Sequence, residues 1–263
     1  MGDSLADRFR VQPGKLADLA GRDPRDRLGY GGKRDGRAAL PPLLEELDGL
    51  HDRLWAEATR SVLLVLQGMD ASGKDGVIRH VLTAIDPQGV RVASFKAPNR
   101  DELAHDYLWR VHAQCPTRGQ VGVFNRSHYE DVVAALLTGA VDRARCELRY
   151  RHIREFERML VDEGTTVVKV FLHISRDEQR DRLQARLDDP TKRWKFHPDD
   201  LDVRSRWSSY QAAYERAITE TSTDWAPWYV VPADHKWARD IAVASILVEA
   251  VTALDPQFPP ADP

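Results

Sequence analysis

The sequence predicts an α/β protein with a parallel sheet of five strands, helices on both faces and a helical lid. Apolar runs of strand length alternate with stretches whose apolar residues recur at helical spacing. The first run has five apolar residues in succession between Ser61 and Gln67, as a strand buried on both faces requires. Strands that are joined through helices form a parallel sheet. The expected strands are 61–67, 90–95, 120–124, 165–174 and 227–233.

The helix expected before the first strand spans residues 40–60. Leucines recur there at helical intervals, and Pro41 and Pro42 fall in the first turn, which tolerates proline. Residues 1–39 are polar and lack sustained periodicity. We interpret them as an arm that is solvated or makes a subunit contact, although its basic residues could touch a polyanion. Residues 40–263 are interpreted as a single domain, with further helices expected at 75–85, 101–114, 146–164 and 237–251.

Composition narrows the class of protein. The chain has 263 residues, of which 30% are charged, and its formal net charge is −3. Proteins that coat nucleic acid are usually basic, so nucleic acid is not an expected partner. No apolar run reaches membrane-spanning length, and the first residues have no apolar signal core. Cys115 and Cys146 lack a metal-binding spacing, and we expect reduced thiols and a cytoplasmic protein without a membrane partner.

The stretch "GMDASGKD" (68–75) has the G-x-x-x-x-G-K spacing of a phosphate-binding loop. It falls between a predicted buried strand and a predicted helix, where backbone N–H groups bind phosphate. The position after Lys74, usually Ser or Thr, is Asp75, and Asp70 lies inside the loop. A carboxylate beside phosphates requires a cation, so Asp70 is the predicted ligand of Mg²⁺. Asp75 either caps the helix or supports Lys74.

The stretch "VFNRSHYEDV" (123–132) follows the third predicted strand. Residues at the carboxyl end of a parallel strand face the ligand crevice, so Asn125 and Arg126 are expected to meet phosphate or metal. Glu130 and Asp131 are further candidate metal ligands. In the alternative interpretation, Ser127 caps a helix and Glu130 is its capping-box partner; both interpretations can hold together.

Residues 176–205 concentrate arginine and lysine in a chain that is acidic overall. We interpret them as a lid that closes positive charge over phosphates. Arg182 and Arg186 lie four positions apart and share a helix face, and Arg186 is the main candidate for a phosphate contact. Because acidic residues are interspersed in this segment, a solvated helix with internal ion pairs is the alternative interpretation. After the second predicted strand, Lys96 and Arg100 are candidates to hold an acceptor's phosphate.

Together these motifs resemble the polyphosphate kinase 2 family over nearly the whole chain. The resemblance rests on "GMDASGKDG", "FKAPNRDELAHDYLWR", "FNRSHYEDV", "RLDDPTKRWKF" and "TSTDWAPWYVVPADHKWARD". It implies a P-loop fold similar to thymidylate kinase, Mg²⁺, inorganic polyphosphate, and AMP, ADP and ATP, with guanine nucleotides as a further option. It also implies a homodimer or homotetramer. The alternatives are an ATP-dependent kinase of a small molecule or nucleoside, and a non-catalytic nucleotide-binding protein.

The resemblance assigns roles by position. The implied catalytic residues are Asp70, Lys74, Arg126 and Arg186. Many members of the family have Asp where this chain has Asn125, and the Asn form resembles the subgroup that phosphorylates both AMP and ADP. The predicted phosphate-binding residues are Gly68, Ala71, Ser72, Gly73, Lys74, Asp75, Arg182, Lys192 and Lys195, and the predicted nucleotide-binding residues are Lys96, Asn99, Arg100, Asp106 and Asn125.

Overall fold

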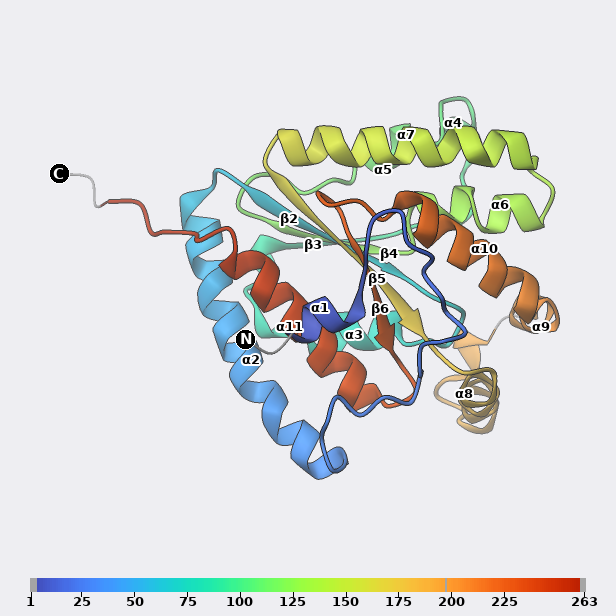
Figure 1. Ribbon diagram of the computed structural model, residues 1–263, viewed down its shortest axis with the longest axis horizontal. Coiled ribbons are helices and arrows are strands. Elements are labelled where there is room, and N and C mark those ends of the chain that lie inside the picture. Colours follow the sequence, from blue (N-terminus) through green and yellow to red (C-terminus); the bar gives the residue numbers. More distant parts are fainter. Residues whose placement is uncertain (1–3, 197, 261–263) are drawn as a thin grey trace.

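A computed structural model describes residues 4–196 and 198–260. His197, inside the predicted lid, lies outside the described residues, as do the first three residues of the arm and the last three of the predicted domain. Figure 1 shows a central sheet between two layers of helices. The sheet order is β1-β6-β5-β2-β4-β3, and only β1 is antiparallel to its neighbour. The strands are β1 (Arg10–Val11), β2 (Ser61–Gln67), β3 (Val90–Ser94), β4 (Val121–Asn125), β5 (Thr165–His173) and β6 (Trp228–Pro232).

The five predicted strands are confirmed to within one residue at each end, but the prediction of only five was wrong. The sixth, β1, comes from the predicted arm and pairs Arg10 with Tyr229 and Val11 with Trp228. Two residues are too short to show the alternation by which a strand is recognised in a sequence. All seven residues of β2 are buried, and β2 pairs in parallel with β4 and β5. The phosphate-binding loop therefore leaves the sheet from a strand held on both sides.

The helix before β2 begins earlier than predicted. Helix α2 spans Lys33–Glu57, so Pro41 and Pro42 lie in its interior rather than in its first turn. The helix continues through both prolines and packs against α11 (Lys236–Thr252). The approach is close, because a Cβ added to Gly36 would lie 2.1 Å from the Trp237 ring.

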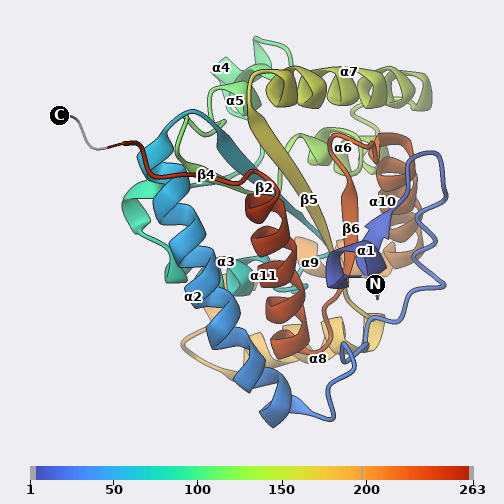
Figure 2. The same cartoon turned by 60° about the vertical axis from the view of Figure 1, so that its left-hand side comes forward.

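The remaining helices cover both faces of the sheet. Figures 1 and 2 show α2, α3 and α11 on one face and α7 and α10 on the other. The predicted helix 101–114 is two short helices, because the Asp106 carboxylate accepts from Leu108 N at 2.9 Å in the turn between them. The helices are α1 (Leu5–Phe9), α3 (Lys74–His80), α4 (Arg100–Leu103), α5 (Trp109–His112), α6 (Ala134–Leu137), α7 (Arg143–Asp162), α8 (Arg176–Asp188), α9 (Asp199–Ser205) and α10 (Trp207–Thr221), with 3-10 turns at Leu82–Ala84, Pro87–Gly89, His128–Asp131 and Arg193–Lys195.

A buried ionic network anchors the segment that follows β4. Lys169 Nζ on β5 donates to Glu157 at 2.6 Å, to Tyr129 Oη at 3.1 Å and to the Thr221 carbonyl at 2.7 Å. Lys169 is fully buried and Glu157 is 1% exposed, so each charge depends on the other. The network joins β5, α7 and α10 to the 3-10 turn at Tyr129, and thereby fixes the segment that carries Arg126.

Candidate active site

The loop between β2 and α3 has the backbone of a phosphate-binding turn. Gly68 and Gly73 adopt φ of +149° and +111°, which favour glycine. A Cβ on Gly73 would lie 1.9 Å from Arg239 Nη1, so this position also lacks room for a side chain. Lys74 begins α3 and folds back over the loop, where its Nζ donates to the Gly68 carbonyl at 2.8 Å.

Burial changes the protonation of Lys74. The side chain is 8% exposed. Burial, with repulsion from Arg126, lowers the pKa of Lys74 to about 8, although Asp70 acts in the opposite direction. The lysine is therefore charged below pH 8 and neutral above it.

This pKa predicts a falling limb in the pH dependence of kcat/KM for the phosphoryl donor. A neutral Lys74 cannot compensate phosphate charge, so kcat/KM should fall about tenfold per pH unit above roughly pH 8. Rates measured from pH 6 to 10 test this. Lys74→Arg is the control, because a guanidinium stays charged across that range. An unchanged limb in Lys74→Arg would assign the titration to another group.

Arg126 lies between two carboxylates. Its Nη2 is 2.6 Å from Asp70 Oδ1, and its Nη1 is 3.9 Å from Glu130 Oε2. Burial works against the guanidinium charge, but Glu130 and Asp70 outweigh it and raise the pKa of Arg126 above its usual value. Burial also raises the pKa of Glu130, while Arg126 and Lys74 oppose that shift. Arg126 therefore provides a positive charge beside Asp70.

The backbone of Arg126 is strained. Its φ is +61°, in the left-handed region that disfavours residues with a Cβ. The backbone N–H donates to Leu66 O at 3.1 Å, which continues the pairing of β4 with β2. This conformation directs the chain at the end of β4 back toward the loop, and such strain is characteristic of functional sites.

The predicted capping box at Ser127 does not form. Ser127 caps a 3-10 turn, and its Oγ accepts from Tyr129 N rather than from Glu130 N. Gln67, in the amide orientation that satisfies its neighbours, donates to Glu130 Oε1 at 3.0 Å. The tighter turn leaves the Glu130 side chain free to meet Arg126 instead of the backbone.

Asn125 and Asp75 meet at the edge of the loop. Asn125 Nδ2 donates to Asp75 Oδ1 at 2.8 Å, and Lys195 Nζ lies 3.9 Å from Asp75 Oδ2. Lys195 belongs to the predicted lid, so one lid cation already contacts the loop. Asp75, the residue after Lys74, therefore links the loop to β4 and to the predicted lid.

Two residues of α8 donate hydrogen bonds to backbone carbonyls of the loop. Arg182 donates through Nη1 to the carbonyls of Ala71 and Ser72, at 3.1 and 2.9 Å. Its other three N–H groups donate to Glu178 and to the Ala233 and Asp234 carbonyls, so all five donors have protein acceptors. Gln179, which the sequence did not single out, donates to the Asp70 carbonyl at 3.0 Å and is fully buried. Direct phosphate contact by Arg182 stays a prediction.

Arg186 and Lys192 face other parts of the predicted lid. Arg186 Nη1 lies 3.6 Å from Asp200 Oδ2 and 3.5 Å from the Lys195 carbonyl, and Lys192 pairs with Asp189. Arg186 thus links α8 to α9 and to the turn that presents Lys195. Its predicted contact with the transferring phosphate stays a prediction.

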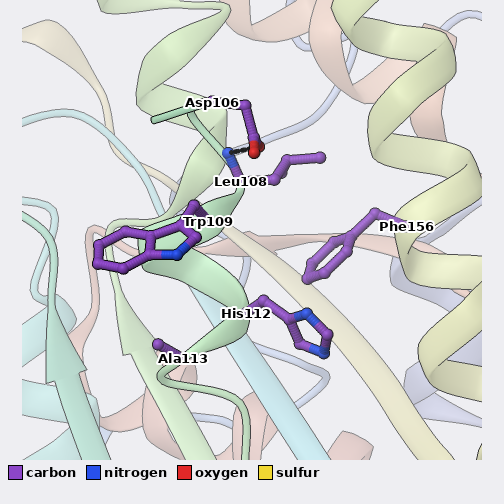
Figure 3. A pocket seen from close by; sticks show the side chains of 6 residues that line it. All are labelled: Asp106, Leu108, Trp109, His112, Ala113 and Phe156. Carbon is purple, nitrogen blue, oxygen red and sulfur yellow. Dashed lines mark hydrogen bonds between the residues drawn. The ribbon is translucent and has the colours of Figure 1, made fainter. Parts of the chain in front are cut away.

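The predicted nucleotide-binding residues divide into two groups. Asn125 lies at the loop, whereas Asn99 forms a capping box with Glu102 at the start of α4. Asp106 lines a separate cavity of about 480 Å³ between α5 and α7, where Figure 3 shows it directed at Leu108 N. Lys96 and Arg100 are exposed. Nucleotide contacts by this second group stay predictions.

The carboxylates beside the loop suit a divalent cation whose other ligands are phosphates of the substrate and water. Asp70 and Glu130 approach the Arg126 guanidinium from its two Nη groups. Asp131, the other predicted ligand, lies 3.6 Å from Arg110. Across residues 4–196 and 198–260, no group of three or more His, Cys, Asp and Glu side chains could hold a metal alone. Mg²⁺ usually takes one or two carboxylates and completes its shell with phosphates and water, so Asp70 and Glu130 fit this requirement.

A glycine-rich loop at the carboxyl edge of a parallel sheet, with Lys74 and Arg126 beside it, defines the class of P-loop phosphotransferases. A family model described as polyphosphate kinase 2 matches residues 31–259. The chain therefore belongs to the polyphosphate kinase 2 family and is a phosphotransferase, as its motifs predicted. No described helix is long and apolar enough to cross a membrane.

The similarity to known proteins covers nearly the whole chain. An AMP/ADP-polyphosphate phosphotransferase of Meiothermus ruber is 54% identical over 253 residues, which are 96% of this chain and 95% of that protein. An ADP-polyphosphate phosphotransferase of Rhodopseudomonas palustris is 42% identical over 268 residues, covering 97% and 93%. The crystal structure of polyphosphate kinase 2 from Arthrobacter aurescens TC1 has a TM-score of 0.94 at 47% identity, covering 99% and 93%. The predicted fold class is confirmed, with six strands in place of five.

Proposed function

We propose that the chain transfers phosphoryl groups from inorganic polyphosphate to both AMP and ADP, forming ADP and ATP, with Mg²⁺ bound at Asp70. The observation that carries the proposal is the ion pair between Asp70, inside the phosphate-binding loop, and Arg126, directly after the end of β4. Two observations support the dual acceptor. The Asn125 form of the motif resembles the subgroup that phosphorylates both AMP and ADP, and the Meiothermus ruber relative that is 54% identical is named an AMP/ADP-polyphosphate phosphotransferase. The reaction is reversible, since both sides contain phosphoanhydrides.

The chemistry requires charge compensation rather than proton removal. A nucleotide phosphate is already ionised near neutral pH, so no general base is needed at its oxygen. The obstacle is repulsion between two polyanions, and positioned cations overcome it. Lys74 and Arg126 would neutralise the transferring group, and Lys195 would add charge from the lid. Bound Mg²⁺ would supply further positive charge and orient the phosphates.

The test offers purified protein Mg²⁺ and polyphosphate with either AMP or ADP, and resolves the nucleotides by chromatography over time. We expect ADP and then ATP from AMP, and ATP from ADP. ATP from ADP alone would contradict the dual acceptor. Nucleotide formation only with an ATP donor would replace the proposal by an ATP-dependent kinase. The same assay with Mn²⁺ or Ca²⁺ in place of Mg²⁺ tests the metal.

A further inference from the structure

We propose that Gln67 is a positioning residue for phosphoryl transfer, because its side chain holds both the backbone next to Arg126 and the carboxylate of Glu130. The inference rests on the proposed function, in which Arg126 neutralises the transferring phosphate. Gln67 is the last residue of β2 and directly precedes Gly68, the first glycine of the loop. Its side chain acts through Arg126 and Glu130, not on the phosphate itself.

The Gln67 amide is buried at the end of an apolar strand. Gln67 is 0% exposed, and residues 62–66 before it are all apolar. A buried amide costs free energy unless its polar atoms are hydrogen-bonded. Its neighbours decide its orientation: with the nitrogen toward Glu130 and the oxygen toward Ser127, donors meet acceptors, whereas the reverse orientation sets oxygen against oxygen. The amide is therefore bonded to the segment that carries Arg126.

The amide oxygen of Gln67 holds the backbone that follows Arg126. It accepts from Ser127 N at 3.0 Å and from Ser127 Oγ at 3.1 Å. The regular pairing of β2 with β4 ends at Leu66 and Asn125, and the Arg126 N–H donates to Leu66 O at 3.1 Å. The Gln67 side chain thus continues the pairing beyond the strands. Hydrogen bonds to β2 hold the chain on both sides of the strained φ of +61°, and such strain persists only where the surroundings fix it.

The amide nitrogen of Gln67 orients the Glu130 carboxylate. It donates to Glu130 Oε1 at 3.0 Å, while Glu130 Oε2 lies 3.9 Å from Arg126 Nη1. An N–H donor also favours the ionised carboxylate, which opposes the burial that raises the pKa of Glu130. Gln67 thereby sets the direction and the charge of one of the two carboxylates between which the guanidinium lies.

The buried ionic network around Lys169 anchors a different part of the same segment. Its contact there is the Tyr129 hydroxyl, 3.1 Å from Lys169 Nζ. The network therefore fixes where the 3-10 turn lies, while Gln67 fixes how Arg126 and Glu130 face each other. Loss of the Gln67 contacts should leave the fold intact and misplace the guanidinium. A displacement of about 1 Å can cost ~10²-fold in rate.

An exchange of the amide and the carboxylate tests the inference. Gln67→Glu sets two carboxylate oxygens at the 3.0 Å contact and removes the N–H that orients Glu130, so kcat with polyphosphate and ADP should fall about a hundredfold. KM for both substrates should change less than about threefold, because a fully buried side chain is not within reach of substrate. Adding Glu130→Gln restores an N–H donor opposite a carboxylate and should recover kcat about tenfold. Gln67→Met fills a similar volume without these hydrogen bonds, and Glu130→Gln should not rescue it.

The matched control is Ser61→Ala, at the other end of β2. It removes a buried hydrogen bond of 3.0 Å to Thr165 Oγ1, so the melting temperature should fall while kcat stays unchanged. An equal loss of kcat in this control, a normal kcat in Gln67→Glu, or multiplicative losses in the exchange variant would overturn the inference. If the unaltered chain forms no nucleotide from polyphosphate, the proposed function is rejected. The exchange is then measured by urea unfolding, where recovered stability supports the Gln67–Glu130 contact and additive losses overturn it.

Discussion

Replacing Asp70 by Asn is expected to lower kcat by about 10²–10³, equivalent to roughly 3–4 kcal/mol of transition-state stabilisation. The substitution keeps the shape of the side chain and removes its charge. The amide can no longer attract Mg²⁺ or pair with the Arg126 guanidinium, which lies 2.6 Å from Asp70 Oδ1. Steady-state rates with polyphosphate and ADP measure the loss. Asp75→Asn is the comparison, and we expect less than a tenfold decrease because Asp75 lies at the rim and its side chain is 66% exposed.

The dependence on Mg²⁺ separates two explanations of such a loss. If Asp70 holds the metal, Asp70→Asn should raise the Mg²⁺ concentration needed for half-maximal rate. If Asp70 only positions Arg126, kcat should fall while that concentration stays the same. Near-normal kcat in Asp70→Asn, with an unchanged melting temperature, would reject both roles. The experiment therefore also tests why a phosphate-binding loop contains a carboxylate.

The sequence predicted the sheet well because buried parallel strands have a simple signature. β2 is apolar from Val62 to Leu66 and lies between two parallel neighbours. Strand β1 was missed because its two residues carry no pattern, and it exists only through pairing with β6. The split of the predicted helix 101–114 was missed because a single hydrogen bond from Leu108 to Asp106 decides it. Such side-chain competition with the helix is invisible in apolar periodicity.

The site was predictable where residues adjoin the loop in sequence or end a neighbouring strand. Asp70, Lys74 and Arg126 come together because β2 and β4 are parallel neighbours whose carboxyl ends share one edge. The contribution of α8 was harder to predict, because Gln179 contacts the Asp70 carbonyl across a separation of 109 residues. Arg182 illustrates the same difficulty. Its charge suggested a phosphate ligand, whereas its donors hold carbonyls of the loop.

Replacing Arg126 by Ala is expected to lower kcat about as much as the change at Asp70, by 10²–10³. The guanidinium is the cation between Asp70 and Glu130, and its loss removes positive charge from the transferring phosphate. Arg126→Lys should lose about tenfold to a hundredfold, because an ammonium is a point charge that cannot span both carboxylates. Rates with saturating polyphosphate and ADP measure these losses. A full rate in Arg126→Ala would mean that other cations at the loop, such as Lys74 and Lys195, stabilise the transition-state charge.

Arg126→Gly separates the role of the side chain from that of the backbone. The φ of +61° costs any residue with a Cβ about 1 kcal/mol relative to glycine. The Gly variant should therefore unfold at a higher temperature than the Ala variant, while both lose the same activity. If the Gly variant recovered activity, the backbone of this segment, and not the guanidinium, would limit the rate. The double variant Asp70→Asn with Arg126→Ala should lose less than the product of the single losses, since the two side chains are in contact. Strictly multiplicative losses would mean that the Asp70–Arg126 pair is dissolved when the substrates bind and that each residue then acts on a different phosphate.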